Sequence, residues 1–122
     1  MKRLLVVDDE PDVCEFVGSV GTETGFSADS AGNYEQFLAV YRPDAFHVIV
    51  VDLVIPGTSG TEFLQILARD RCRAGIVLVS GADLQVLSAA ERFASFHGLT
   101  VLGTLAKPIM VHELMRLLAK AS

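Results

Sequence analysis

The sequence predicts an α/β fold in which a doubly wound, five-stranded parallel sheet is flanked by five helices. Three observations lead to this prediction. Short apolar runs alternate along the chain with segments of helical periodicity. Four of these runs are continuously apolar, which is typical of strands covered on both faces of a parallel sheet. Strand and helix alternate five times, and right-handed crossovers then place helices on both faces.

The predicted strands are five short segments. The continuous apolar runs, which we expect to be buried on both faces, are residues 4–7, 48–51, 76–79 and 99–102. Residues 26–31 form a weaker segment in which apolar residues alternate with small or polar ones. That alternation suits a strand at the edge of the sheet.

The helices are predicted from apolar residues that recur at intervals of three and four. These stripes are Val13, Phe16, Val17 and Val20; Tyr34, Phe37, Leu38 and Tyr41; Phe63, Ile66 and Leu67; Val86, Ala89, Ala90 and Phe93; and Met110, Leu114, Leu117, Leu118 and Ala121. Pro11 suits the first turn of the first helix, and Asn33 with Gln36 resembles a capping box at the start of the second. Gly18 and Gly21 inside the first helix each cost roughly 1 kcal/mol relative to alanine.

Length and composition narrow the classes of function. The 122 residues fit a single domain, residues 1–122. A net charge of −5 with scattered basic residues argues against a nucleic-acid surface. Apolar runs are too short to cross a membrane. Cys14 and Cys72 have no metal-binding spacing, which favours reduced thiols in a cytoplasmic protein.

Polar residues follow four of the predicted strands. Asp8 and Asp9 follow the first strand, Asp52 the third, Ser80 the fourth and Lys107 the fifth. In open α/β sheets, ligands bind outside the carboxyl ends of the strands, so we expect these groups to converge there. Three neighbouring carboxylates repel one another unless a cation intervenes, and Mg²⁺ prefers such oxygen ligands. Lys107 would add a mobile positive charge.

This combination suits phosphoryl transfer. A carboxylate can act as the nucleophile, a metal and an ammonium can neutralise charge, and a hydroxyl can donate a further hydrogen bond. Asp52 is the natural acceptor because it ends a central strand, between the acid pair and Ser80. Each residue alone has an ordinary structural explanation as a helix cap, turn residue or surface charge. Their joint appearance at four strand ends favours a site.

The motifs that contain these residues resemble the receiver domain of the two-component response-regulator family over essentially the whole chain. They are residues 6–11, residues 50–53 with Pro56, Gly57 and Gly60, residues 79–82, and residues 106–108. The resemblance implies a flavodoxin-like fold with strand order 2-1-3-4-5. It also implies that the glycines let the loop after Asp52 turn tightly.

The resemblance implies a role for each site residue. Asp52 would accept a phosphoryl group from a sensor histidine kinase or a histidine phosphotransfer protein. Ser80 would hydrogen-bond the phosphoryl group, and Lys107, before a cis Lys107-Pro108 bond, would pair with it. The domain would catalyse only its own phosphorylation and dephosphorylation, and so would not be an enzyme with a separate substrate.

The metal ligands follow from the same resemblance. Asp9 would bind Mg²⁺ directly and Asp8 chiefly through water. Asp52 and the backbone carbonyl of Val54 would complete the protein ligands.

One position departs from the family pattern. Thr104 stands where the family commonly has tyrosine or phenylalanine, so an aromatic rotor is not the readout of phosphorylation. We therefore expect the signal to leave through the fourth helix, the fifth strand and the fifth helix, on a face that also suits a homodimer. The output would be carried by a separate partner or by a domain after Ser122.

Three other functions remain as alternatives. An aspartate-nucleophile phosphatase wants a second acid two residues after the nucleophile, where this chain has Val54. A nucleotide- or flavin-binding module would need a glycine-rich phosphate loop, where this chain has acids at residues 8–10. A module that kept the fold and lost the chemistry would not need the intact set of polar residues.

Overall fold

Five parallel strands form one sheet in the computed structural model, which describes residues 1–81 and 83–121. Ala82, part of the motif at residues 79–82, and Ser122 lie outside the described residues. The strands are β1 (Lys2–Val7), β2 (Phe26–Ala31), β3 (Val48–Asp52), β6 (Gly75–Ser80) and β7 (Thr100–Ala106). Their order, β2-β1-β3-β6-β7, confirms the predicted order, since β6 and β7 are the fourth and fifth strands of this sheet.

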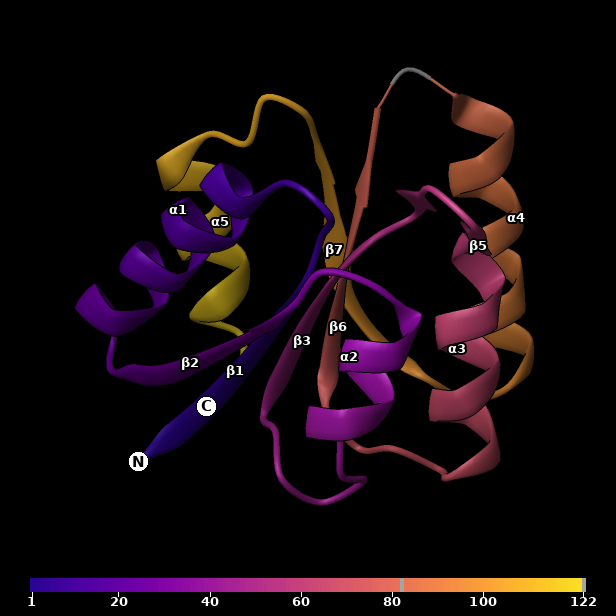
Figure 1. The fold of residues 1–122 in the computed structure, drawn as a ribbon, viewed down its shortest axis with the longest axis horizontal. Coiled ribbons are helices and arrows are strands. Elements are labelled where there is room, and N and C mark those ends of the chain that lie inside the picture. The colour runs from indigo at the N-terminus through magenta and orange to yellow at the C-terminus, as the bar shows by residue number, and fades with distance from the viewer. Residues whose placement is uncertain (82, 122) are drawn as a thin grey trace.

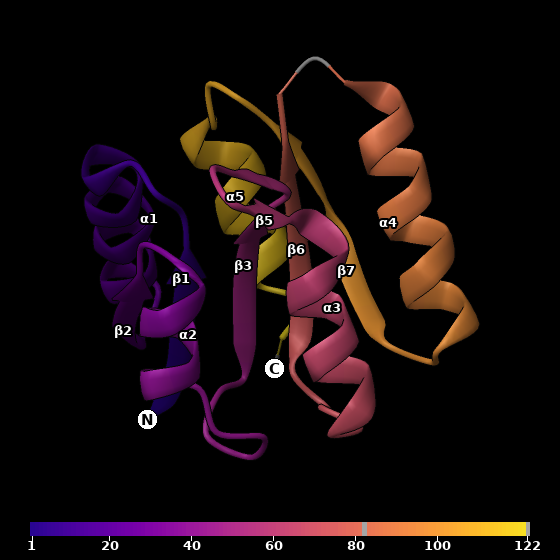
Figure 2. The same cartoon turned by 45° about the vertical axis from the view of Figure 1, so that its right-hand side comes forward.

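Helices cover both faces of the sheet (Figures 1 and 2). One face carries α1 (Pro11–Glu23) and α5 (Val111–Leu118). The other carries α2 (Tyr34–Val40), α3 (Gly60–Arg69) and α4 (Leu84–Phe96). Each face buries its own apolar cluster, so the fold is a three-layer sandwich with two cores.

The continuous apolar runs serve both cores at once. In β1, Leu4 and Val6 belong to the core under α1 and α5. Leu5 and Val7 point the opposite way, into the core under α2, α3 and α4. Successive side chains of a strand alternate between faces, so a strand covered on both sides must be apolar at every position.

The last strand differs from its prediction. Residues 99–102 were expected to form a strand buried on both faces, but β7 runs from Thr100 to Ala106 at the sheet edge and is mostly half-buried. It contains a β-bulge, because Ile76 pairs with Val101 while Val77 pairs with Gly103. The small and polar residues of its second half gave no continuous apolar signal. The bulge sets the register that pairs Ser80 with Ala106, beside Lys107.

The predicted helix signals are largely confirmed. Pro11 is the first residue of α1, and the Asn33 side chain accepts a hydrogen bond of 2.8 Å from the Gln36 N–H. Five stripe positions differ from the prediction. Leu38 is 45% exposed on the outer side of the short α2, and Ala89 is also exposed. Tyr41 follows α2, Met110 precedes α5 and Ala121 follows α5, so these three lie outside their helices.

The loop after β3 holds a small hairpin that the sequence pattern did not reveal. It pairs β4 (Val54–Ile55) with β5 (Thr58–Ser59) in antiparallel fashion. Gly57 turns the hairpin with φ +81°, a conformation that favours glycine. Gly60 is needed for a different reason from the expected backbone freedom. A Cβ there would lie 2.6 Å from the carbonyl oxygen of Leu53.

Candidate functional site

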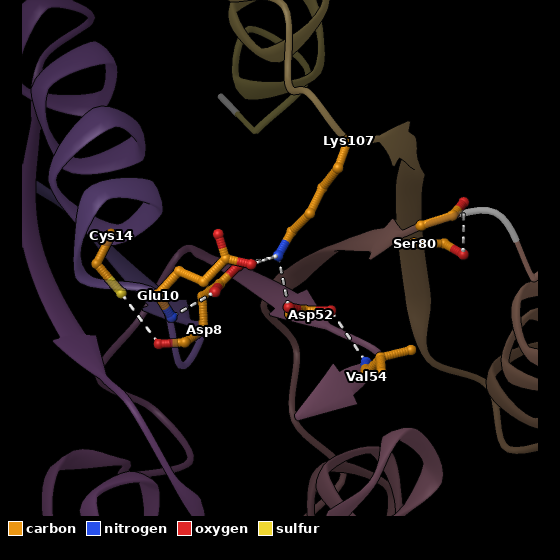
Figure 3. Close-up of polar contacts among 8 residues, drawn as sticks. Asp8, Glu10, Cys14, Asp52, Val54, Ser80 and Lys107 are labelled. Carbon is orange, nitrogen blue, oxygen red and sulfur yellow. Dashed lines mark hydrogen bonds and ion pairs between the residues drawn. The ribbon is translucent and has the colours of Figure 1, made fainter. Parts of the chain in front are cut away.

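Two buried carboxylates lie at the carboxyl edge of the sheet (Figure 3). Asp8 directly follows β1 and is 2% exposed, and its Oδ1 accepts a 2.9 Å hydrogen bond from the Glu10 N–H. Asp52 is the last residue of β3 and is 3% exposed. Its Oδ1 accepts a 2.9 Å hydrogen bond from the Val54 N–H, at the start of the hairpin. The local backbone therefore orients both carboxylates.

The Lys107 side chain reaches across the strand ends to join the acidic groups. Its Nζ lies 2.8 Å from Asp52 Oδ2, 3.1 Å from Glu10 Oε1 and 3.2 Å from Asp8 Oδ2. Figure 3 shows the ammonium group between Asp52 on one side and Asp8 with Glu10 on the other. The Lys107 N–H donates to the Ser80 carbonyl at 3.1 Å, and the Lys107-Pro108 peptide bond is cis, as expected.

The electrostatics of the pocket favour a cation. Burial raises the pKa of Asp8 above its ordinary value; the Glu10 N–H opposes this and the charge of Asp52 adds to it. Burial by itself lowers the pKa of Lys107, but its hydrogen bonds to Asp52, Glu10 and Asp8 outweigh burial and raise the pKa overall. The pKa of Asp8 thus stays raised although the Lys107 ammonium group lowers it, so a further positive charge would stabilise the ionised carboxylate.

The donor set fits a hard divalent cation. Asp8, Asp9 and Glu10 each offer a carboxylate oxygen, and these oxygens lie within 4.8 Å of one another. Mg²⁺ and Ca²⁺ prefer carboxylate and carbonyl oxygens of this kind. Asp9 is exposed and Asp8 is buried, so the cluster reaches from the solvent into the pocket. The predicted ligand roles of Asp8, Asp9, Asp52 and the Val54 carbonyl stay predictions.

Ser80 is the last residue of β6 and lies at the same carboxyl edge of the sheet, but its hydroxyl contacts the segment before α4. The residue is 2% exposed, and Oγ lies 3.5 Å from the backbone carbonyls of both Gly81 and Asp83. These are weak contacts at the limit of hydrogen-bond distance. Asp83 is the N-cap of α4 and accepts from two N–H groups of its first turn. The structure therefore brings Asp8, Asp52 and Lys107 together and leaves the Ser80 hydroxyl against the start of α4.

Two contacts of the site were not found from the sequence. Glu10 was noticed only as one member of an acidic run, yet it holds Lys107. The half-buried thiol of Cys14 donates to the Asp8 carbonyl at 3.3 Å. The thiol contact could have been suggested by the position of Cys14, because a side chain in the first turn of α1 can reach back to the end of the preceding strand. Nothing in the spacing indicates the Glu10 contact.

Comparison with known proteins identifies the family. Residues 4–119 match the family model of the response regulator receiver domain, and the chain belongs to that family. A response regulator receiver protein of Anaeromyxobacter is 32% identical over 118 residues, which is 96% of this chain and 47% of that protein. The alkaline phosphatase synthesis transcriptional regulatory protein SphR of Synechococcus elongatus is 28% identical over 92 residues, covering 68% of this chain and 36% of SphR.

Solved structures agree with this assignment. A response regulator from Colwellia psychrerythraea is 30% identical, with a TM-score of 0.81 over 98% of this chain and 96% of the other. The chain is a receiver domain of two-component response regulators, a family of phosphorylation-dependent signalling proteins in which Mg²⁺ is a general feature. It spans only 18% to 47% of the length of the curated relatives it matches.

Proposed function

We propose that Asp52 accepts a phosphoryl group from the phosphohistidine of a sensor histidine kinase or a histidine phosphotransfer protein. The observation that carries this proposal is the 2.8 Å contact between the Lys107 ammonium group and the buried Asp52 carboxylate. A buried acid at the carboxyl end of a central strand, held beside a cation, is a nucleophile with charge neutralisation already in place.

The residues of the pocket have distinct roles in the transfer. A carboxylate oxygen of Asp52 attacks phosphorus, and the P–O bond forms as the P–N bond breaks with its electron pair remaining on the histidine nitrogen. The Val54 N–H fixes the carboxylate through Oδ1. Lys107 follows the transferred group and neutralises charge on its oxygens. The Ser80 hydroxyl leaves its weak contacts with the backbone and donates to a phosphoryl oxygen.

Asp8 and Asp9, with Asp52 and the Val54 carbonyl, would hold Mg²⁺ in this pocket. The bound ion supplies positive charge to the acids and to the phosphoryl oxygens. Without it, Asp8 and Asp52 have Lys107 as their one cationic contact among the described residues.

An apolar recess beside the pocket suits a partner that brings the histidine. A cavity of about 480 Å³ is lined by Glu10 and Lys107 together with apolar side chains of α1 and of the segment before α5, among them Phe16 and Ile109. A partner helix seated there would present its phosphohistidine to the site from the solvent side.

We place the domain in the cytoplasm. Cys14 and Cys72 are both free thiols, as in reducing compartments. Within residues 1–81 and 83–121, no helix combines the length and apolarity that a bilayer crossing requires.

We further propose that the chemistry is confined to self-modification. Hydrolysis of the phosphoryl group would end the signal without turnover of a separate phosphomonoester. Val54 lies two residues after Asp52, at the position where an aspartate-nucleophile phosphatase requires its second acid. Steady release of phosphate from such a substrate, at many equivalents per protein, would contradict this assignment.

The test is intact-mass measurement after incubation with acetyl phosphate. The wild type should gain one phosphate in Mg²⁺ and none in EDTA, and Asp52→Asn should gain none. Asp44→Asn is the matched control, because Asp44 is exposed and outside the pocket. A phosphorylated Asp52→Asn protein, or equal labelling in EDTA, would defeat the proposal.

A further inference from the structure

Glu10 is placed unusually for the residue that starts a helix. It is the N-cap of α1, yet its side chain makes no capping hydrogen bond. The residues preferred at an N-cap, serine, threonine, aspartate and asparagine, accept a hydrogen bond from a free N–H of the first turn. Here Oε1 lies 3.1 Å from Lys107 Nζ instead.

Of the three carboxylates that contact Lys107, Glu10 is the one that faces the solvent. Its side chain is 59% exposed, whereas those of Asp8 and Asp52 are 2% and 4% exposed. Glu10 and Lys107 both line the apolar cavity beside the pocket. A donor that approaches Asp52 from this side passes the Glu10 carboxylate.

The distance between Glu10 and the acceptor is short. Both Glu10 Oε1 and Asp52 Oδ2 contact the same ammonium nitrogen, at 3.1 and 2.8 Å, so these two oxygens lie less than about 6 Å apart. Two unit charges at about 6 Å in water interact strongly enough to change a rate about threefold. Salt at about 0.15 M, with a Debye length of about 8 Å, reduces this to less than about twofold.

We infer that Glu10 biases the domain toward small phosphoryl donors of lower negative charge, by holding Lys107 from the solvent side and repelling donors of high negative charge. This inference rests on the proposed function of Asp52. The repulsion grows with each negative charge on the donor, so Glu10 should slow a dianionic donor more than a monoanionic one.

The experiment compares two donors of different charge. Acetyl phosphate is a dianion near neutral pH, and phosphoramidate carries one negative charge fewer. Phosphorylation rates are measured by intact mass at low ionic strength and saturating Mg²⁺. We expect Glu10→Gln to raise the ratio of the acetyl phosphate rate to the phosphoramidate rate by about threefold. At about 1 M salt, where the Debye length is about 3 Å, the ratio should return to the wild-type value.

Two further variants isolate the charge at this position. Glu10→Asp keeps the charge and should retain a ratio close to that of the wild type. Glu15→Gln removes the same charge from an exposed position on α1, where the described contacts include none to Lys107, and should leave the ratio unchanged. A threefold change in Glu15→Gln would overturn the inference.

Other results would also overturn it. Equal acceleration of both donors in Glu10→Gln, or an increase that persists at high salt, would show that Glu10 does not discriminate by charge. The affinity for Mg²⁺ alone, measured by calorimetry, should stay within about twofold of wild type. A tenfold loss of this affinity with slowing of both donors would make Glu10 a metal ligand instead. No labelling of the wild type by either donor would refute the proposed function and the inference with it.

Discussion

Replacing Lys107 by methionine removes the ammonium group while keeping most of the volume of the side chain. In the folded protein that group contacts three carboxylates, two of which belong to the buried residues Asp8 and Asp52. Without it, two buried acids face each other with no cation between them. We therefore expect Lys107→Met to destabilise the metal-free protein.

The geometry gives the magnitude. Asp8 Oδ2 and Asp52 Oδ2 contact the same nitrogen at 3.2 and 2.8 Å, so they lie less than about 6 Å apart. At an effective dielectric constant of about 20, two charges at that distance repel by about 3 kcal/mol. Removing one partner of a buried ion pair costs about 3–5 kcal/mol. Because the Lys107 side chain is 24% exposed, we expect a loss of about 2–3 kcal/mol in the free energy of unfolding.

The pH dependence has a definite sign. The pKa of Asp8 is raised mainly by burial, so the folded protein binds this proton more tightly than the unfolded chain does. Loss of Lys107 removes an interaction that lowers this pKa, so it rises further. Protonation of Asp8 therefore stabilises the fold of the variant as the pH falls through its folded-state pKa. The pKa of Lys107 in the wild type is raised above its ordinary value, so this group stays charged across the neutral and acidic range. The difference between the two proteins therefore changes with pH only through the carboxylates that Lys107 contacts.

The assay is urea unfolding followed by circular dichroism, in EDTA, at neutral and mildly acidic pH. The difference between wild type and Lys107→Met should shrink at the lower pH, and Mg²⁺ should recover part of the loss at neutral pH. Lys120→Met is the matched control. The Lys120 ammonium group has one polar partner among the described residues, the Leu102 carbonyl, so its loss should cost about 1 kcal/mol or less. A Lys107→Met protein as stable as the wild type at neutral pH would refute the reasoning.

Three further predictions concern the helices and the route of the signal. Gly18→Ala should raise the free energy of unfolding by about 1 kcal/mol, because the added Cβ would lie at an ordinary contact distance of 3.6 Å from the Ala28 Cβ. Gly21→Ala should bring no gain, because its added Cβ would lie 2.6 Å from a methyl group of Leu4. Tyr41→Phe should leave the free energy of unfolding in urea unchanged or raise it by up to about 1 kcal/mol, because the buried Tyr41 hydroxyl has no hydrogen-bond partner among the described residues. A lower free energy of unfolding would contradict this prediction. Beryllofluoride with Mg²⁺ should change hydrogen exchange most in residues 81–96. Thr104→Ala should retain most of that change, because a threonine side chain can respond only by rotamer. A response confined to the β4–β5 hairpin, or abolished in Thr104→Ala, would contradict this route.

The position of the site could be predicted because parallel topology leaves few choices. Asp8 and Asp52 directly follow apolar runs that are buried on both faces, so each had to emerge at the carboxyl edge of the sheet. Lys107 follows the last strand, whose register with β6 brings it beside Ser80. Hydrophobic patterning indicates the strands and their parallel direction, whereas the strand order came from the family resemblance.

The side-chain conformations of the site could not be predicted in the same way. Whether Glu10 caps its own helix or holds Lys107 depends on the competition between two partners of similar strength. The Ser80 hydroxyl lies against the Gly81 and Asp83 carbonyls, and the rotamer that places it there cannot be known from its position after a strand. The close approach of Gly60 to the Leu53 carbonyl likewise appears only when tertiary packing is known. Local spacing carries no information about such choices.

The residue that receives the phosphoryl group can be identified directly by chemical trapping. Borohydride reduces an aspartyl phosphate to homoserine, and peptide mass spectrometry then locates the converted residue. After incubation with acetyl phosphate and Mg²⁺, the account predicts homoserine at position 52 and at no other aspartate, with none formed in EDTA. Homoserine at position 8 or 9, or a phosphorylated protein with an unconverted Asp52, would contradict it.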